Sequence, residues 1–141
     1  MNDDLRKLDS ARLVLKTSLG LTAFLAGADK FAGVLADWPH YLSPAVRAIL
    51  PVAPTTFMTV VGVIEMAVGI AILGRWTRAG SYLAMAWLLG IAGNFVVAGS
   101  FLDVAVRDVV LATAAFALAR LTEALAAPRA VGAASRLSVA A

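Results

Sequence analysis

Four apolar stretches dominate this chain, and they limit it to one broad class of fold. They cover roughly residues 13–28, 56–73, 79–98 and 104–121. An α-helix rises 1.5 Å per residue and the hydrocarbon core of a bilayer is about 30 Å thick, so each stretch is interpreted as a membrane-crossing helix. Lys16 near the start of the first stretch can snorkel, and Arg107 and Asp108 lie in the first turn of the last. The sequence therefore predicts an all-α fold, a four-transmembrane-helix bundle.

The composition agrees with a membrane location. Of the 141 residues, 61% are hydrophobic and 15% are charged, and the mean hydropathy is +0.86. Soluble domains have about 45–50% apolar and about 25% charged residues. One domain is enough for a chain of this length. We divide it into a cytoplasmic N-terminal segment (1–12), a four-helix membrane domain (13–125) and a cytoplasmic tail (126–141).

The basic residues predict the orientation of the bundle. Nine of the twelve lie on one side of the predicted membrane, and three lie on the other. The nine are Arg6, Lys7, Arg12, Lys16, Arg75, Arg78, Arg120, Arg129 and Arg136, and the three are Lys30, Arg47 and Arg107. Because cytoplasmic loops carry an excess of Lys and Arg, both termini and the 74–78 turn are predicted to be cytoplasmic.

The longest predicted connection, residues 31–55, lies on the outer side and is rich in proline. It contains Pro39, Pro44, Pro51 and Pro54, and a short helix is predicted over residues 45–50. We interpret the connection as an amphipathic cap on the outer leaflet, with a lid as the alternative. Residues 128–141 are predicted to form a poorly ordered or surface-lying tail.

Glu65 is the strongest pointer to function, because it stands alone in the otherwise uncharged run 58–73. A charged carboxylate at the bilayer centre costs about 2.5–3.5 kcal/mol on insertion scales. Gly62 and Gly69 share its helix face, and Gly90 shares a face with Asn94 on the next stretch. Since small residues let helices approach closely, Gly62, Gly69 and Gly90 are predicted helix-packing positions.

The remaining charges converge at the outer end of the predicted bundle. Asp103 and Arg107 are spaced to pair along one helix face. Glu65 lies deeper, on the order of 12–15 Å below the outer end, where it meets Arg107 or Lys30, contacts water or is protonated. The candidate site residues are Glu65, Arg107, Asn94, Lys30, Asp29 and Asp108. Two interpretations stay open for them: a network that fixes helix register, or a quinone-headgroup or proton-relay site open to the outer face.

Several kinds of chemistry are excluded by composition. The chain has no cysteine, which excludes disulfides, iron–sulfur clusters and cysteine-ligated zinc. The only histidine, His40, lies in a predicted loop, so a haem held by two histidines is also excluded. Neither a metal site nor a catalytic residue is predicted, and no basic face with interleaved aromatics indicates a nucleic-acid partner. Any redox role would use a non-covalently bound carrier, with a quinone as the candidate, or belong to a partner.

Three segments resemble one family. They are LGLTAFLAGADKF (19–31), GVIEMAVGIAILG (62–74) followed by Arg78-Ala79-Gly80, and DVAVRDVVLA (103–112). In order and spacing they resemble the DoxX-like family of small bacterial four-helix membrane proteins, over roughly residues 13–121. The residues that carry the resemblance are Gly27, Lys30, Phe31, Glu65, Gly69, Gly74, Asn94, Arg107 and Asp108.

The resemblance implies a multi-pass protein of the bacterial inner (cytoplasmic) membrane. Family members are integral-membrane subunits associated with oxidoreductases, including thiosulfate:quinone oxidoreductase and a complex with superoxide dismutase and a sulfurtransferase. This chain would then be an accessory or anchoring subunit, not catalytic alone, with lipids and other subunits or further copies of itself as partners. The outer face offers only Lys30, Arg47 and Arg107 to an anion such as thiosulfate.

Two other functions stay open. One is a purely structural, lipid-facing subunit of a larger membrane assembly. The other is a small proton-coupled transporter, since small multidrug resistance proteins also combine four helices with one membrane glutamate. Those proteins carry the glutamate in the first span, whereas Glu65 lies in the second predicted span, and this order counts against transport.

Overall fold

The computed structural model describes the backbone of residues 3–139 and the side-chain surroundings of residues 3–126. It is 86% helical and has no strand in the described residues, which confirms the all-α prediction. The elements are α1 (Asp3–Ala32), η1 (Trp38–Tyr41), α2 (Pro44–Ile49), α3 (Pro54–Leu73), α4 (Thr77–Ala98) and α5 (Leu102–Val139).

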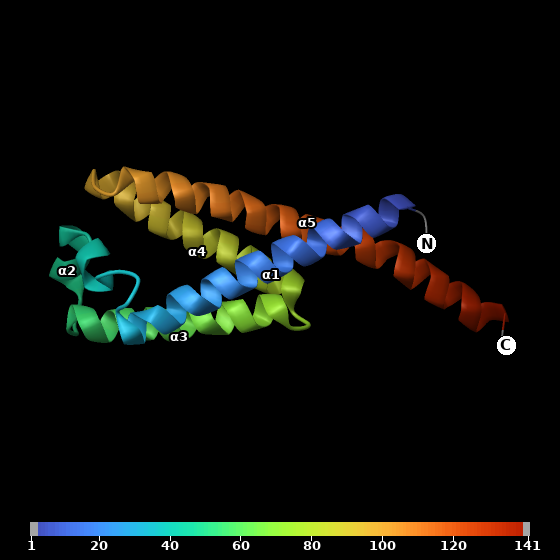
Figure 1. The fold of residues 1–141 in the computed structure, drawn as a ribbon, viewed down its shortest axis with the longest axis horizontal. Coiled ribbons are helices and arrows are strands. Elements are labelled where there is room, and N and C mark those ends of the chain that lie inside the picture. The colour runs from blue at the N-terminus through green and yellow to red at the C-terminus, as the bar shows by residue number, and fades with distance from the viewer. Residues whose placement is uncertain (1–2, 140–141) are drawn as a thin grey trace.

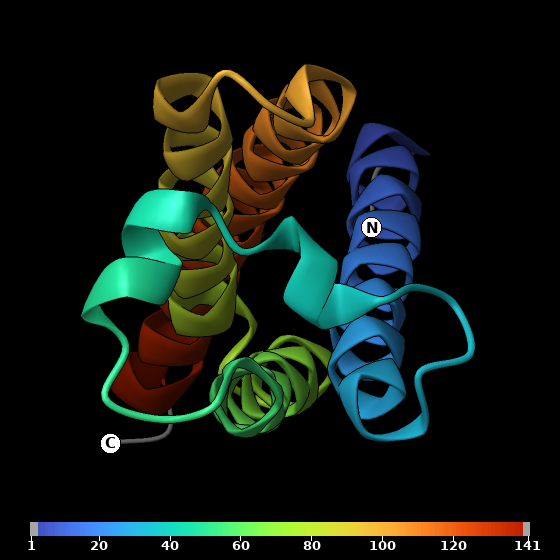
Figure 2. The same ribbon diagram turned by 90° about the vertical axis from the view of Figure 1, so that its left-hand side faces the viewer.

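The four long helices lie side by side, with α1 packed chiefly on α3 and α4 packed chiefly on α5 (Figure 1). Further contacts between α1 and α5 and between α3 and α4 close the arrangement into a ring (Figure 2). The start of α1, the α3–α4 turn and the end of α5 lie toward one end of the bundle. The α1–α3 connection and the α4–α5 turn lie at the other end (Figure 1).

Three helices in the described part of the chain, α1, α3 and α4, are long and apolar enough to cross a membrane. The fourth predicted span, residues 104–121, falls within α5, which is not one of the three. In the most apolar 18-residue stretch of each of these helices, only 17–33% of the residues are buried inside the chain. Most of this apolar surface therefore needs a nonpolar environment from outside the chain, which is consistent with a membrane protein.

Alanines form much of the buried face of α5, beside larger core side chains such as Ile72 and Leu118, and further large apolar side chains cover the outside of the bundle. The fully or nearly buried positions of α5 include Ala105, Ala112, Ala115 and Ala119. In contrast, Val97 is 89% exposed and Val106 is 66% exposed. Other exposed large side chains are Leu13, Val14, Leu25, Val63, Ile70, Leu83, Val109 and Val110. Helices that meet through small residues and turn large ones outward are typical of packing in lipid.

The connection between α1 and α3 packs across one end of the bundle (Figure 2). The predicted short helix is observed as α2, with Pro44 in its first turn and the Ser43 hydroxyl accepting a hydrogen bond from the Val46 amide. Leu42 is buried in a cluster with Met58 and Val61 of α3. The connection is thus a cap that is held by apolar packing.

The described backbone is helical in both terminal segments. Helix α1 already begins at Asp3, within the predicted N-terminal segment, and the backbone of α5 continues through the predicted tail to Val139. The tail is rich in alanine, which has the highest helix propensity, so a helix continues where hydropathy alone predicts poor order. The side chains of residues 127–141 and the backbone of 140–141 lie outside the described part of the chain.

Four glycines bring α1 and α3 into backbone contact. A Cβ atom added to Gly27 would lie 2.6 Å from the Gly62 carbonyl oxygen, and one added to Gly69 would lie 2.7 Å from that of Gly20. The predicted packing positions Gly62 and Gly69 therefore lie against α1. Gly90 does not pack in this way: it is exposed, and nothing in the described chain lies within 4 Å of a Cβ placed there. The face of Gly90 on α4 turns away from the other three helices, so its role as a packing position stays a prediction.

Candidate functional site

The centre of the candidate site is an ion pair between α1 and α3. The Lys30 ammonium nitrogen lies 2.5 Å from a carboxylate oxygen of Glu65, and the two side chains are only 4% and 13% exposed. Lys30 follows Gly27 by three residues and Glu65 follows Gly62 by three residues. The close contact of these two glycines therefore sets the separation of the helices at which the two charges meet.

Trp38 of η1 covers the ion pair from the cap. Its ring centroid lies 3.7 Å from the Lys30 nitrogen, a cation–π contact. The Trp38 indole N–H donates a hydrogen bond of 2.8 Å to Asp29, which also accepts from the amides of Val34 and Leu35. Asp29 thus shapes the turn after α1 and holds Trp38 over Lys30.

A second buried acid, Asp108, lies on α5, and its side chain is 5% exposed. The Arg107 guanidinium lies 3.3 Å from the Asp108 carboxylate, although the Arg107 side chain is 63% exposed. Lys30 therefore pairs with the acid of α3, and Arg107 pairs with Asp108 of α5 from the outside.

These contacts correct the predicted pairing of Arg107 with Asp103, and they identify which of the partners left open for Glu65 it meets. The ion pair of Arg107 in the described residues is formed with its neighbour Asp108, not with Asp103 one turn earlier. Likewise, the ion-pair partner of Glu65 in the described residues is Lys30. The reason is burial: Asp108 faces the bundle and needs a cation, whereas Asp103 is exposed to its surroundings.

Asn94 of α4 holds the cap rather than the ion pair. Its side-chain carbonyl accepts a hydrogen bond of 2.9 Å from the hydroxyl of Ser43, the residue that caps α2. Sequence reasoning missed both Ser43 and Trp38 as members of this region. The only sequence signal was their place in the proline-rich connection, and no pattern there shows how the connection folds back onto the bundle.

The arrangement offers proton and hydrogen-bond chemistry. Within the described residues, no group of three or more His, Cys, Asp or Glu side chains could hold a metal ion. The partly exposed Glu65 carboxylate can accept a proton, and the Lys30 ammonium donates a hydrogen bond to it. No model of a protein family, no curated protein and no solved structure matches the chain.

Proposed function

We propose that this chain is an accessory or anchoring integral-membrane subunit of a respiratory-type oxidoreductase complex, not catalytic alone, in the inner membrane of a bacterium. In this proposal α5 supplies a fourth membrane crossing and both termini are cytoplasmic. The uneven distribution of lysine and arginine supports the orientation. The resemblance of the Lys30, Glu65 and Arg107 segments to DoxX-like proteins supports the oxidoreductase partner.

The observation that carries the proposal is the buried Lys30–Glu65 pair within apolar helices. Ionisable groups at such depth are expensive, and they commonly mark ion, proton or ligand pathways. Because Lys30 is paired with Glu65, a proton gained by Glu65 would leave the Lys30 charge without its partner between α1 and α3. We propose that this site contributes a proton or a hydrogen bond to a quinone used by the partner complex.

The test is Glu65→Gln, which keeps the shape of the side chain but removes its ionisation. The variant is expected to insert and to co-purify in mild detergent with its redox partner. The quinone-linked turnover of the partner should fall, or its pH profile should shift, because a general acid–base group contributes typically about 10²–10⁴-fold. Glu123→Gln is the matched control, since Glu123 pairs with Arg120 of α5 and accepts from Tyr82 of α4, away from the Lys30–Glu65 pair.

Full turnover of the Glu65→Gln complex at every pH would reject a quinone or proton role for the site. The chain would then be a purely structural subunit, and one observation favours this second candidate. Gly90 and Gly93 of α4 are exposed, share a helix face and have open space beside them in the described chain. Such a face accepts a helix of another subunit at close range.

Gly90→Leu tests the structural candidate, with Ala67→Leu on the exposed face of α3 as its control. If a partner helix packs on Gly90, the leucine should break the complex on a native gel while the chain itself stays folded. The control should leave the complex intact. A complex that survives Gly90→Leu would exclude this face. If the gel instead shows a homodimer, and its two chains insert in opposite orientations, proton-coupled transport would be favoured.

A further inference from the structure

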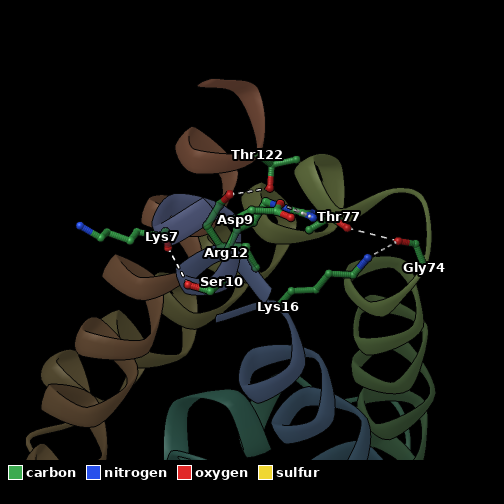
Figure 3. Close-up of polar contacts among 9 residues, drawn as sticks. Lys7, Asp9, Ser10, Arg12, Lys16, Gly74, Thr77 and Thr122 are labelled. Atoms are coloured by element: carbon green, nitrogen blue, oxygen red, sulfur yellow. Dashed lines mark hydrogen bonds and ion pairs between the residues drawn. The ribbon is translucent and has the colours of Figure 1, made fainter. Parts of the chain in front are cut away.

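A cavity of about 450 Å³ opens at the end of the bundle opposite the Lys30–Glu65 pair. It lies where α1, the α3–α4 turn and α5 meet (Figure 3). Its lining consists of Arg12, Lys16, Gly74, Arg75, Trp76, Thr77, Arg78, Ala79 and Thr122. The volume lies within the range of about 300–1,000 Å³ that is usual for small-ligand sites.

Among the described residues, the lining contains four cations and no acidic side chain. The Lys16 ammonium donates a hydrogen bond of 2.9 Å to the Gly74 carbonyl, and this neutral group does not cancel its charge (Figure 3). The Arg75 guanidinium lies 5.1 Å from the Trp76 ring centroid.

The other two cations are near carboxylates that lie outside the lining. Arg12 pairs with Asp9 at 3.0 Å, and Arg78 lies 4.0 Å from Glu123, which is also bound by Arg120. Two acids near four cations leave the cavity with net positive charge.

The start of α4 adds hydrogen-bond donors to the same cavity. The first helical bond runs from the Gly80 amide to the Trp76 carbonyl, and α4 has no side-chain cap. The Thr77 hydroxyl is used elsewhere, because it donates to the carbonyls of Ile72 and Gly74. The amides of residues 77–79 therefore begin the helix without a capping side chain, and such amides attract anions.

We propose that this cavity binds the phosphate group of an anionic phospholipid, with phosphatidylglycerol as the representative lipid. Trp76 belongs to the lining and is 61% exposed. Leu13 and Val14, whose apolar side chains are exposed, lie between Arg12 and Lys16 in the sequence. A lipid headgroup could thus enter from the side while its acyl chains follow the apolar helix surface. Basic pockets between helices at the cytoplasmic side are suited to anionic lipid headgroups. The proposal requires the membrane location and is independent of any redox partner.

The test measures thermal stability of the full chain in detergent during titration with phosphatidylglycerol, phosphatidylcholine or inorganic phosphate. Phosphatidylglycerol is expected to raise the melting temperature in a saturable way, and the other two are not. The double variant Arg75→Gln/Arg78→Gln should bind phosphatidylglycerol roughly twenty-five-fold more weakly, because each cation near an anionic lipid surface contributes about fivefold. Both side chains are exposed, so their replacement leaves the fold intact.

Arg6→Gln/Lys7→Gln is the matched control, because it removes the same charge from exposed positions of α1 outside the cavity. The control should bind phosphatidylglycerol like the unchanged chain. Equal weakening in the two double variants would mean that only net charge attracts the lipid, and would overturn the proposal. Equal stabilisation by inorganic phosphate would overturn it in favour of a free-anion site, and binding unaffected by Arg75→Gln/Arg78→Gln would exclude the cavity.

Discussion

Gly27 of α1 and Gly62 of α3 face each other so closely that a Cβ atom on either would lie 2.6 Å from the carbonyl oxygen of the other. The contact is reciprocal and involves backbone atoms, which cannot rotate away as a side chain can. Lys30 and Glu65 follow these glycines at the same offset, so the backbone contact and the ion pair are parts of one junction.

Alanine at Gly27 or Gly62 is expected to destabilise the bundle, because α1 and α3 must separate to admit the methyl group. Overpacking of this kind costs about 1–3 kcal/mol. Gly90→Ala is the control: it has open space and should be neutral or stabilising by up to about 1 kcal/mol, since alanine favours helix. Unfolding in detergent micelles measures all three, and equal stabilities would contradict the observed contact.

Lys30→Met should be strongly destabilising because it leaves the Glu65 carboxylate buried without its cation. Removing one partner of a buried pair costs about 3–5 kcal/mol. Replacing both residues, as Lys30→Met/Glu65→Leu, should recover much of this loss, since no unpaired charge then remains at the junction. A double-mutant cycle on unfolding free energies measures the coupling, and additive effects would show that the two charges do not interact.

Trp38→Phe should keep an aromatic ring over Lys30 but remove the indole donor to Asp29. A hydrogen bond to a charged group contributes about 1.5–3 kcal/mol, so the melting temperature should fall. Trp38→Leu should lower it further, because the cation–π contact is also lost. Trp76→Phe, at an exposed ring on the opposite end, serves as the control. A melting temperature unchanged by Trp38→Leu would contradict a packed cap.

The proposed orientation can be tested with introduced cysteines, because the chain has none of its own. Ala48 on the cap and Ser10 at the start of α1 are exposed and lie at opposite ends of the bundle. Ser43 is unsuitable for labelling, since it is 4% exposed and caps α2. A membrane-impermeant thiol reagent should label Ala48→Cys in intact cells, and Ser10→Cys only after permeabilisation. The reverse pattern would invert the orientation.

The local features of this fold could be predicted from the sequence because they depend on neighbours along the chain. Hydropathy and length located the apolar helices, although α1 and α5 extend further than their apolar stretches. Proline positions located α2 within one residue at each end. Helical spacing alone also puts Gly62, Glu65 and Gly69 on one face.

By itself, then, the sequence determined that this chain is all-helical, where its apolar helices run and which residues share a face. Only the tertiary structure decided that Glu65 meets Lys30 rather than Arg107, that the face of Gly90 stays open, and that four cations surround one cavity. Periodicity defines the face of a residue relative to its own helix. The rotation and depth of one helix against another arise from the packing of whole surfaces, here the backbone contact of α1 with α3, and no local pattern encodes them.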